Sequence, residues 1–190
     1  TMHINLAEKN PSRLLNSLQS AFEDEPDEIT IELIGPGVLY HDTALMLHEE
    51  MKSHAGVTRV HVRARTCLID GAVLLWLAAD TRSMRDDTWI QVNEVPDDLD
   101  FTVNKNYPHA ICTSDEGPSK TDFRTILKYI NQYLPVNEIA GFRLFAPDIQ
   151  EFGLLEDCED SLTPYFFPDT EEPLPPTPQD RPIRNSNSKI

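Results

Sequence analysis

The chain has few basic residues, no long apolar run and only three cysteines. Lys and Arg number 16 against 32 Asp and Glu, which gives a net charge of -16. A surface that binds phosphates needs clustered basic side chains, so nucleic acid is not expected as a partner. The longest apolar run, 72–79, is far shorter than the roughly 20 residues that cross a bilayer, and the first residues lack the layout of a signal peptide. The sequence therefore predicts a soluble, cytoplasmic protein without membrane contact.

The cysteines and histidines do not have the spacing of a metal site or a disulfide framework. Cys67, Cys112 and Cys158 are odd in number and form no CxxC pair. The histidines form neither an HxH nor an HxxxH pair, and the acidic residues of 86–98 lack EF-hand spacing. We therefore expect reduced thiols, no metal and no cofactor.

Short β-branched segments alternate with helical patterns along much of the chain. Residues 57–65 alternate between apolar and basic side chains, which is typical of a half-exposed strand. Residues 71–79 are apolar on every side, which indicates a buried helix, and Asp70 is placed to cap it. The same periodicities predict strands over 2–6, 29–34 and 88–92, and helices over 11–22, 42–54 and 119–130. This alternation predicts an α/β fold with a mostly parallel sheet.

Two segments depart from this pattern. Residues 96–118 are rich in Asp, Asn and Pro, which predicts a long irregular insertion. From residue 162 the chain is rich in proline and acidic residues, a composition that does not form its own core. We therefore predict one folded domain over 1–161 and an extended acidic tail over 162–190, through which a protein or peptide partner could bind.

Self-association is expected through apolar groups that a small core leaves uncovered. Ala44, Leu47 and Met51 share one face of the helix predicted over 42–54. Trp76, inside the apolar helix, is expected in the core, and Trp89 either in the core or at a subunit contact.

Several short strings resemble, in order, the Clp protease proteolytic subunit and the wider crotonase-like group. Residues 34–38 (Ile-Gly-Pro-Gly-Val) resemble the family's strand that ends in a Pro-Gly-Gly turn. Residues 71–75 and 79–82 resemble the helix after its nucleophile and the arginine that follows. Residues 126–131 and 151–156 (Glu-Phe-Gly-Leu-Leu-Glu) resemble its late helix and its closing segment. The resemblance implies a ClpP/crotonase-like fold of repeated strand-helix units and a subunit that assembles with its own copies.

The family's catalytic residues are missing from the matching positions. Its serine falls on Cys67 or Leu68, and its histidine falls on Asn93, whose amide cannot take up a proton near neutral pH. In the turn that would offer backbone N–H groups to an oxyanion, Gly37 is kept and Val38 replaces the second glycine. We therefore predict a ClpP-like protein without a Ser-His-Asp triad, which acts as a non-catalytic, oligomeric binding or scaffold subunit.

Cys67 keeps an enzymatic alternative open. A thiol in the serine's place, activated by Arg63, Arg65 or His61, would make an active ClpP-like peptidase or hydrolase. The commoner role of such a cysteine is a small buried residue at a strand end. The two arginines also belong to the basic face of 59–65, which could bind an acidic peptide or the acidic tail of a neighbour.

Two other functional classes share strings with the chain. Ile69-Asp70-Gly71 is similar to the strand end and turn of STAS-like regulatory domains, which act by protein binding. Residues 77–82 and 93–95 are similar to strings of crotonase-type acyl-CoA proteins. The glycine run that should precede these strings is absent, and the phosphates of coenzyme A favour basic residues that this chain scarcely has.

Overall fold

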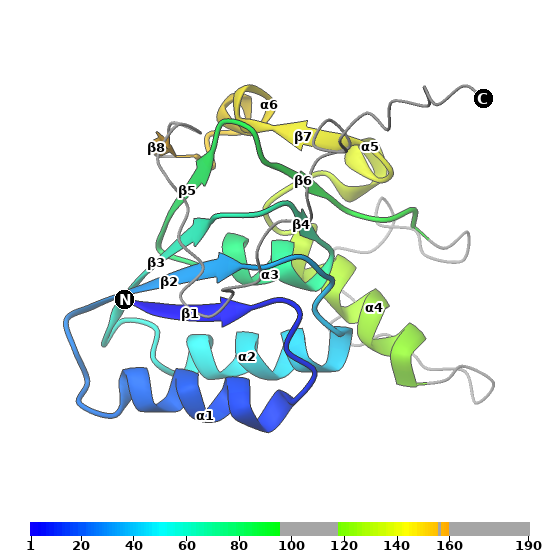
Figure 1. Ribbon diagram of the computed structural model, residues 1–190. Coiled ribbons are helices and arrows are strands. Elements are labelled where there is room, and N and C mark those ends of the chain that lie inside the picture. The colour runs from blue at the N-terminus through cyan, green and yellow to red at the C-terminus, as the bar shows by residue number, and fades with distance from the viewer. Residues whose placement is uncertain (96–117, 156, 160–190) are drawn as a thin grey trace, which may run out of the picture.

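Two β-sheets form the framework of the computed structural model, which describes residues 1–95, 118–155 and 157–159 (Figure 1). Sheet A has the strand order β1-β2-β3-β5-β8, and each neighbouring pair is parallel. Its strands are β1 (Met2–Asn5), β2 (Glu28–Ile34), β3 (Arg59–Ala64), β5 (Thr81–Arg85) and β8 (Asp157–Glu159). Sheet B has the order β4-β6-β7, with β4 (Leu68–Ile69), β6 (Trp89–Gln91) and the antiparallel β7 (Arg143–Phe145). The predicted α/β class and mostly parallel sheet are confirmed.

Helices cover one face of sheet A. They are α1 (Pro11–Phe22), α2 (His41–Ser53) and α3 (Gly71–Leu77), and α4 (Pro118–Ile130) packs on α2 and α3. Figure 1 shows α1 and α2 side by side beneath the sheet. Two short helices, α5 (Val136–Ile139) and α6 (Ala146–Glu151), flank β7. The core between sheet and helices is built from aliphatic side chains such as Ile31, Leu33, Leu47 and Val62, each fully buried.

The predicted helix starts and ends agree closely with the observed ones. At α1, the Asn10 side chain accepts a hydrogen bond from the Arg13 N–H, and Pro11 occupies the first turn. After α2, Gly56 has φ +84°, a conformation that favours glycine and lets the chain turn into β3. These local signals place both helices within about one or two residues of their predicted bounds.

Helix α3 is the centre of the core, as its uniformly apolar sequence predicts. All seven of its residues are buried, and Trp76 also donates its indole N–H to the Ser83 carbonyl at 3.0 Å. A Cβ at Gly71 would lie 2.5 Å from the Cβ of Ala44, so the close contact of α3 with α2 requires glycine at this position. The prediction that Trp76 lies in the core is confirmed.

Two features differ from the sequence-based predictions. The sequence does not predict strand β5, because its second residue, Arg82, breaks the apolar alternation. The Arg82 guanidinium donates to the carbonyls of Leu77, Ala79 and Leu154 and is thereby buried. The apolar face of α2 is not available for self-association, because α3 and α4 cover it and its residues Ala44, Leu47 and Met51 are at most 3% exposed.

The insertion predicted over 96–118 falls outside the described residues except for Pro118, which begins α4. The tail predicted over 162–190 lies wholly outside them. Among the described residues, no helix combines the length and apolarity needed to cross a membrane.

His48, buried between α2 and α4 beside the Tyr129 ring, makes folding stability depend on pH. Burial, with a smaller effect of the Lys52 charge, lowers its pKa from 6.5 to about 4. Between these values the unfolded chain binds a proton that the folded chain does not, so the free energy of unfolding falls as the pH drops from 6.5 towards 4. Urea titrations of wild type and His48→Gln across this range should show a smaller pH dependence in the variant.

Lys52→Gln is the matched control for this prediction. Because the lysine charge is the lesser cause of the lowered pKa, this variant should keep most of the wild-type pH dependence. Identical pH dependence in wild type and His48→Gln would contradict the assignment of a buried, neutral imidazole.

Candidate functional site

The topology of sheet B brings Asp70 and Asn93 together. Strands β4 and β6 are parallel neighbours, with Ile69 opposite Gln91, so the residues that follow them emerge at the same edge. Asp70 comes directly after β4 and Asn93 two residues after β6. The carboxyl ends of parallel strands are where ligand sites form in α/β folds, which makes this edge the candidate site.

Asp70 is held in an unusual conformation at the turn between β4 and α3. Its φ and ψ are 46° and -101°, and its residue is only 1% exposed. One carboxylate oxygen accepts from the backbone N–H of Asn93 at 2.8 Å, and the other accepts from the side-chain amide of Asn93. The carboxylate makes no capping bond to α3, so the predicted capping role is wrong: the strained backbone turns the side chain towards Asn93.

His41 is the third polar side chain at this site. It is the first residue of α2, and its Nε2 lies 3.7 Å from a carboxylate oxygen of Asp70. Its imidazole stacks on the Phe123 ring from α4, with ring centroids 5.1 Å apart and planes 17° apart. The ring is therefore held in place between a buried carboxylate and an aromatic face, while a quarter of its side chain is exposed.

The turn between β2 and α2 lies beside His41 in the chain and contains two of the predicted binding residues. Gly37 has φ +139°, and a Cβ there would lie 3.2 Å from the Leu6 carbonyl oxygen, so this position needs glycine. Val38 and Tyr40 are both about half exposed. Exposed hydrophobic side chains therefore directly precede His41 in the chain.

Cys67 and Leu68 do not occupy the turn before α3, where the sequence comparison placed a nucleophile. Leu68 is fully buried in β4, and Cys67 precedes that strand. Cys67 is a free, partly exposed thiol, which corrects the expectation of a buried strand-end cysteine. Arg63 and Arg65 instead reach the Glu32 carboxylate of β2, at 3.5 and 3.2 Å. Within the described ranges, no hydrogen bond joins Cys67 to a base.

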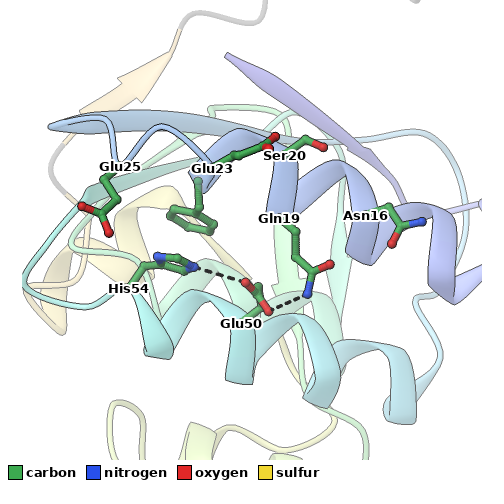
Figure 2. Close-up of a pocket in the computed structure, with 8 residues that line it drawn as sticks. Asn16, Gln19, Ser20, Glu23, Glu25, Glu50 and His54 are labelled. Atoms are coloured by element: carbon green, nitrogen blue, oxygen red, sulfur yellow. Dashed lines mark hydrogen bonds and ion pairs between the residues drawn. The ribbon is translucent and has the colours of Figure 1, made fainter.

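A separate shallow pocket of about 460 Å³ lies between α1 and α2, at the far end of α2 from His41 (Figure 2). In it the His54 ring stacks on Phe22 at 4.1 Å, and Glu50 joins His54 to Gln19 through hydrogen bonds. These contacts link the two helices, so we assign the pocket a packing role. In the part of the chain that the structure describes, no three His, Cys, Asp or Glu side chains gather as a metal site would require.

Sequence analysis found Asn93 but missed Asp70 and His41 as its neighbours. The sequence does place Asp70 between a short apolar strand and an apolar helix. An aspartate at that position is more often a helix cap than part of a functional site. His41 gave no signal, because its place beside Asp70 depends on the packing of α2 against α3.

Solved structures of ClpP proteins match the fold of this chain. The ClpP protease catalytic domain from Plasmodium falciparum matches with a TM-score of 0.62 and 8% identity, over 86% of this chain and 87% of that one. ClpP1 from Listeria monocytogenes matches with a TM-score of 0.58 and 14% identity, over 84% and 90%. No protein-family profile and no curated protein sequence matches the chain. The chain therefore has a ClpP-like fold, as its short sequence strings predict.

Proposed function

We propose that this chain is a ClpP-fold subunit that does not hydrolyse peptides and instead acts as a binding or scaffold subunit in an assembly of its own copies. The observation that carries the proposal is the buried Asp70 carboxylate at the turn into α3, bound through both oxygens by Asn93. In the family that the sequence resembles, a nucleophilic serine precedes this helix and a histidine activates it.

The chemistry of Asp70, Asn93 and His41 supports this proposal. Acyl transfer needs a nucleophile that a substrate carbonyl can approach and a base that takes its proton. Asp70 is 1% exposed and already accepts two hydrogen bonds, and the amide of Asn93 cannot serve as a base. The His41 imidazole pairs with this carboxylate through Nε2 at 3.7 Å, as the base of a hydrolase pairs with the acid that orients it, but the thiol of Cys67 precedes β4 and is not at this turn.

Exposed phenylalanines support the assembly part of the proposal. Phe142, Phe145 and Phe152 lie in or beside β7 and α6 and are 65%, 42% and 41% exposed. Strand β7 is at the edge of sheet B, so its outer backbone groups lack a strand partner among the described elements. Apolar groups beside an open sheet edge favour a contact with another protein chain.

Light scattering and a peptidase assay on the full chain test the two parts of this function. We expect a mass of several subunits and no turnover of fluorogenic peptides by wild type or Cys67→Ser. Phe142→Ser should lower the mass, whereas Val57→Ser, also an apolar-to-polar change at an exposed position but before β3, should not. A monomeric wild type would contradict the assembly, and turnover that disappears in Cys67→Ser would contradict the absence of catalysis.

A further inference from the structure

Two ring contacts join α2 to α4. His41, the first residue of α2, stacks on Phe123 with ring centroids 5.1 Å apart, and His48 lies against Tyr129 with centroids 4.7 Å apart. The two histidines are seven residues apart, so they lie on the same side of α2 and about 10 Å from each other along its axis. Figure 1 shows α4 beside α2 and α3. One helix therefore contacts both the candidate site and the middle of α2.

His48 is the buried histidine of this pair. It is 5% exposed, and among the residues that the structure describes its Nδ1 has no hydrogen-bond partner. A neutral imidazole has one nitrogen without a proton, whereas the protonated ring carries an N–H on both nitrogens and a positive charge. A proton on His48 would therefore add a buried charge to a ring that lacks an acceptor at Nδ1, which is costly.

The groups that face His48 do not offset such a charge. Lys52, one turn further along α2, is a cation and opposes the proton. Tyr129 of α4 presents an aromatic ring, and α3, which also packs on α2, contains no titratable residue. Glu50 lies on the side of α2 that contacts α1. The other charged residues of α2 and α4 are Asp42, Glu49, Lys120, Asp122, Arg124 and Lys128.

The charges on α4 are mostly positive. Three of its four charged residues are Lys or Arg, and the fourth, Asp122, lies two turns before Tyr129, next to Phe123 in the chain. The closed arrangement of α2 and α4 therefore favours a neutral His48.

We propose that a proton on His48 releases α4 from α2 and thereby removes the Phe123 ring from His41, so that the candidate site is closed at neutral pH and opens in acid. When α4 leaves, water solvates the charged ring and satisfies its N–H groups. Ile126, Leu127 and Ile130 are fully buried and keep the open state rare at neutral pH. Because α4 packs mainly on α2 and α3, it can open as a local unit while sheet A stays folded.

The pH range and the size of the effect follow from the two states of His48. In the closed state, burial and, to a smaller extent, Lys52 lower its pKa to about 4, and in the open state the pKa returns to 6.5. Between these values the open state binds the proton and the closed state does not, so closure is favoured above pH 6.5 and weakens as the pH falls towards 4. The ratio of open to closed molecules should therefore rise about twentyfold between pH 7 and pH 5.

Amide hydrogen exchange of the full chain at pH 7 and pH 5, measured by mass spectrometry of peptides, tests the proposal. After correction for the pH dependence of exchange in an unfolded chain, wild-type peptides from α4 should open about twentyfold more at pH 5, and peptides from β2 and β3 should change much less. His48→Gln, which takes up no proton, should give the same opening at both pH values. His54→Gln, the matched loss of a histidine from the side of α2 that contacts α1, should keep the wild-type response.

His48→Leu is a second variant, in case a glutamine at this buried position disturbs the packing, and it should also make the opening of α4 independent of pH. Equal pH responses of α4 in wild type and His48→Leu would overturn the proposal. An equal increase in α4, β2 and β3 would overturn it too, because His48 would then be protonated only in globally unfolded molecules. A response in the peptide around Tyr129 without one around Phe123 would likewise contradict it, because the release would not extend to the candidate site.

Discussion

Trp76→Ala is expected to destabilise the fold by about 3–5 kcal/mol, a large fraction of the roughly 5–15 kcal/mol by which folded proteins are stable. The Trp76 side chain is fully buried at the centre of α3, and the surrounding helices and sheet cannot collapse into the space it would leave. Urea unfolding followed by circular dichroism measures the loss.

Two other tryptophan variants separate the causes of this loss. Trp76→Phe keeps most of the ring but removes the hydrogen bond to the Ser83 carbonyl, which should cost about 1–3 kcal/mol. Trp89→Phe alters a half-buried ring beneath the Arg143 guanidinium and should cost less than about 1 kcal/mol. A Trp76→Ala protein as stable as Trp89→Phe would show that α3 is not the core helix.

Asn93→Asp should destabilise the protein by about 1–3 kcal/mol, because it replaces a hydrogen bond to Asp70 with the repulsion of two carboxylates. Asn93→Ala, which removes the side-chain bond without adding charge, should cost less, since Asn93 is exposed and its backbone N–H still reaches Asp70. The difference between the two variants in the free energy of unfolding, measured with urea, gives the contribution of the repulsion between the carboxylates.

Adding Asp70→Asn should restore much of the stability that Asn93→Asp removes. In the double variant the amide and the carboxylate exchange positions, so a donor again faces an acceptor, and the amide oxygen at position 70 still accepts from the backbone N–H of position 93. The double-mutant cycle should therefore give a coupling of about 1–3 kcal/mol. If the stability losses of the two single variants simply add in the double variant, the two side chains do not interact as the structure places them.

Much of the fold could be predicted because local signals agree with tertiary packing. Asn10 and Pro11 mark a helix start through backbone chemistry alone, and residues 71–77 are apolar on all sides because α3 is enclosed on all sides. Strand β5 could not be predicted, since Arg82 looks solvent-exposed until the carbonyls that accept its hydrogen bonds are brought together by folding.

The candidate site was predictable only in part. Asn93 could be located because the resemblance places the family's histidine at the end of the strand that the sequence predicts over 88–92. The resemblance leaves a one-residue gap before the apolar helix, so it places the family's serine on Cys67 or Leu68, and β4, only two residues long, gives no sequence pattern that would move this position to Asp70. The positive φ of Asp70, which identifies the turn, is a property of the folded backbone and has no sequence signature for aspartate.

The central claim is that a locked carboxylate stands where a hydrolase of this fold would carry a reactive nucleophile. Treatment of the folded full chain with a fluorophosphonate, and separately with a low dose of iodoacetamide, tests it most directly, with adducts counted by intact mass and assigned by the masses of digested peptides. The account predicts no fluorophosphonate adduct, and labelling of Cys67 no faster than that of a free cysteine in solution. A stoichiometric fluorophosphonate adduct at a single serine, or alkylation of Cys67 well above the rate of free cysteine at neutral pH, would contradict it.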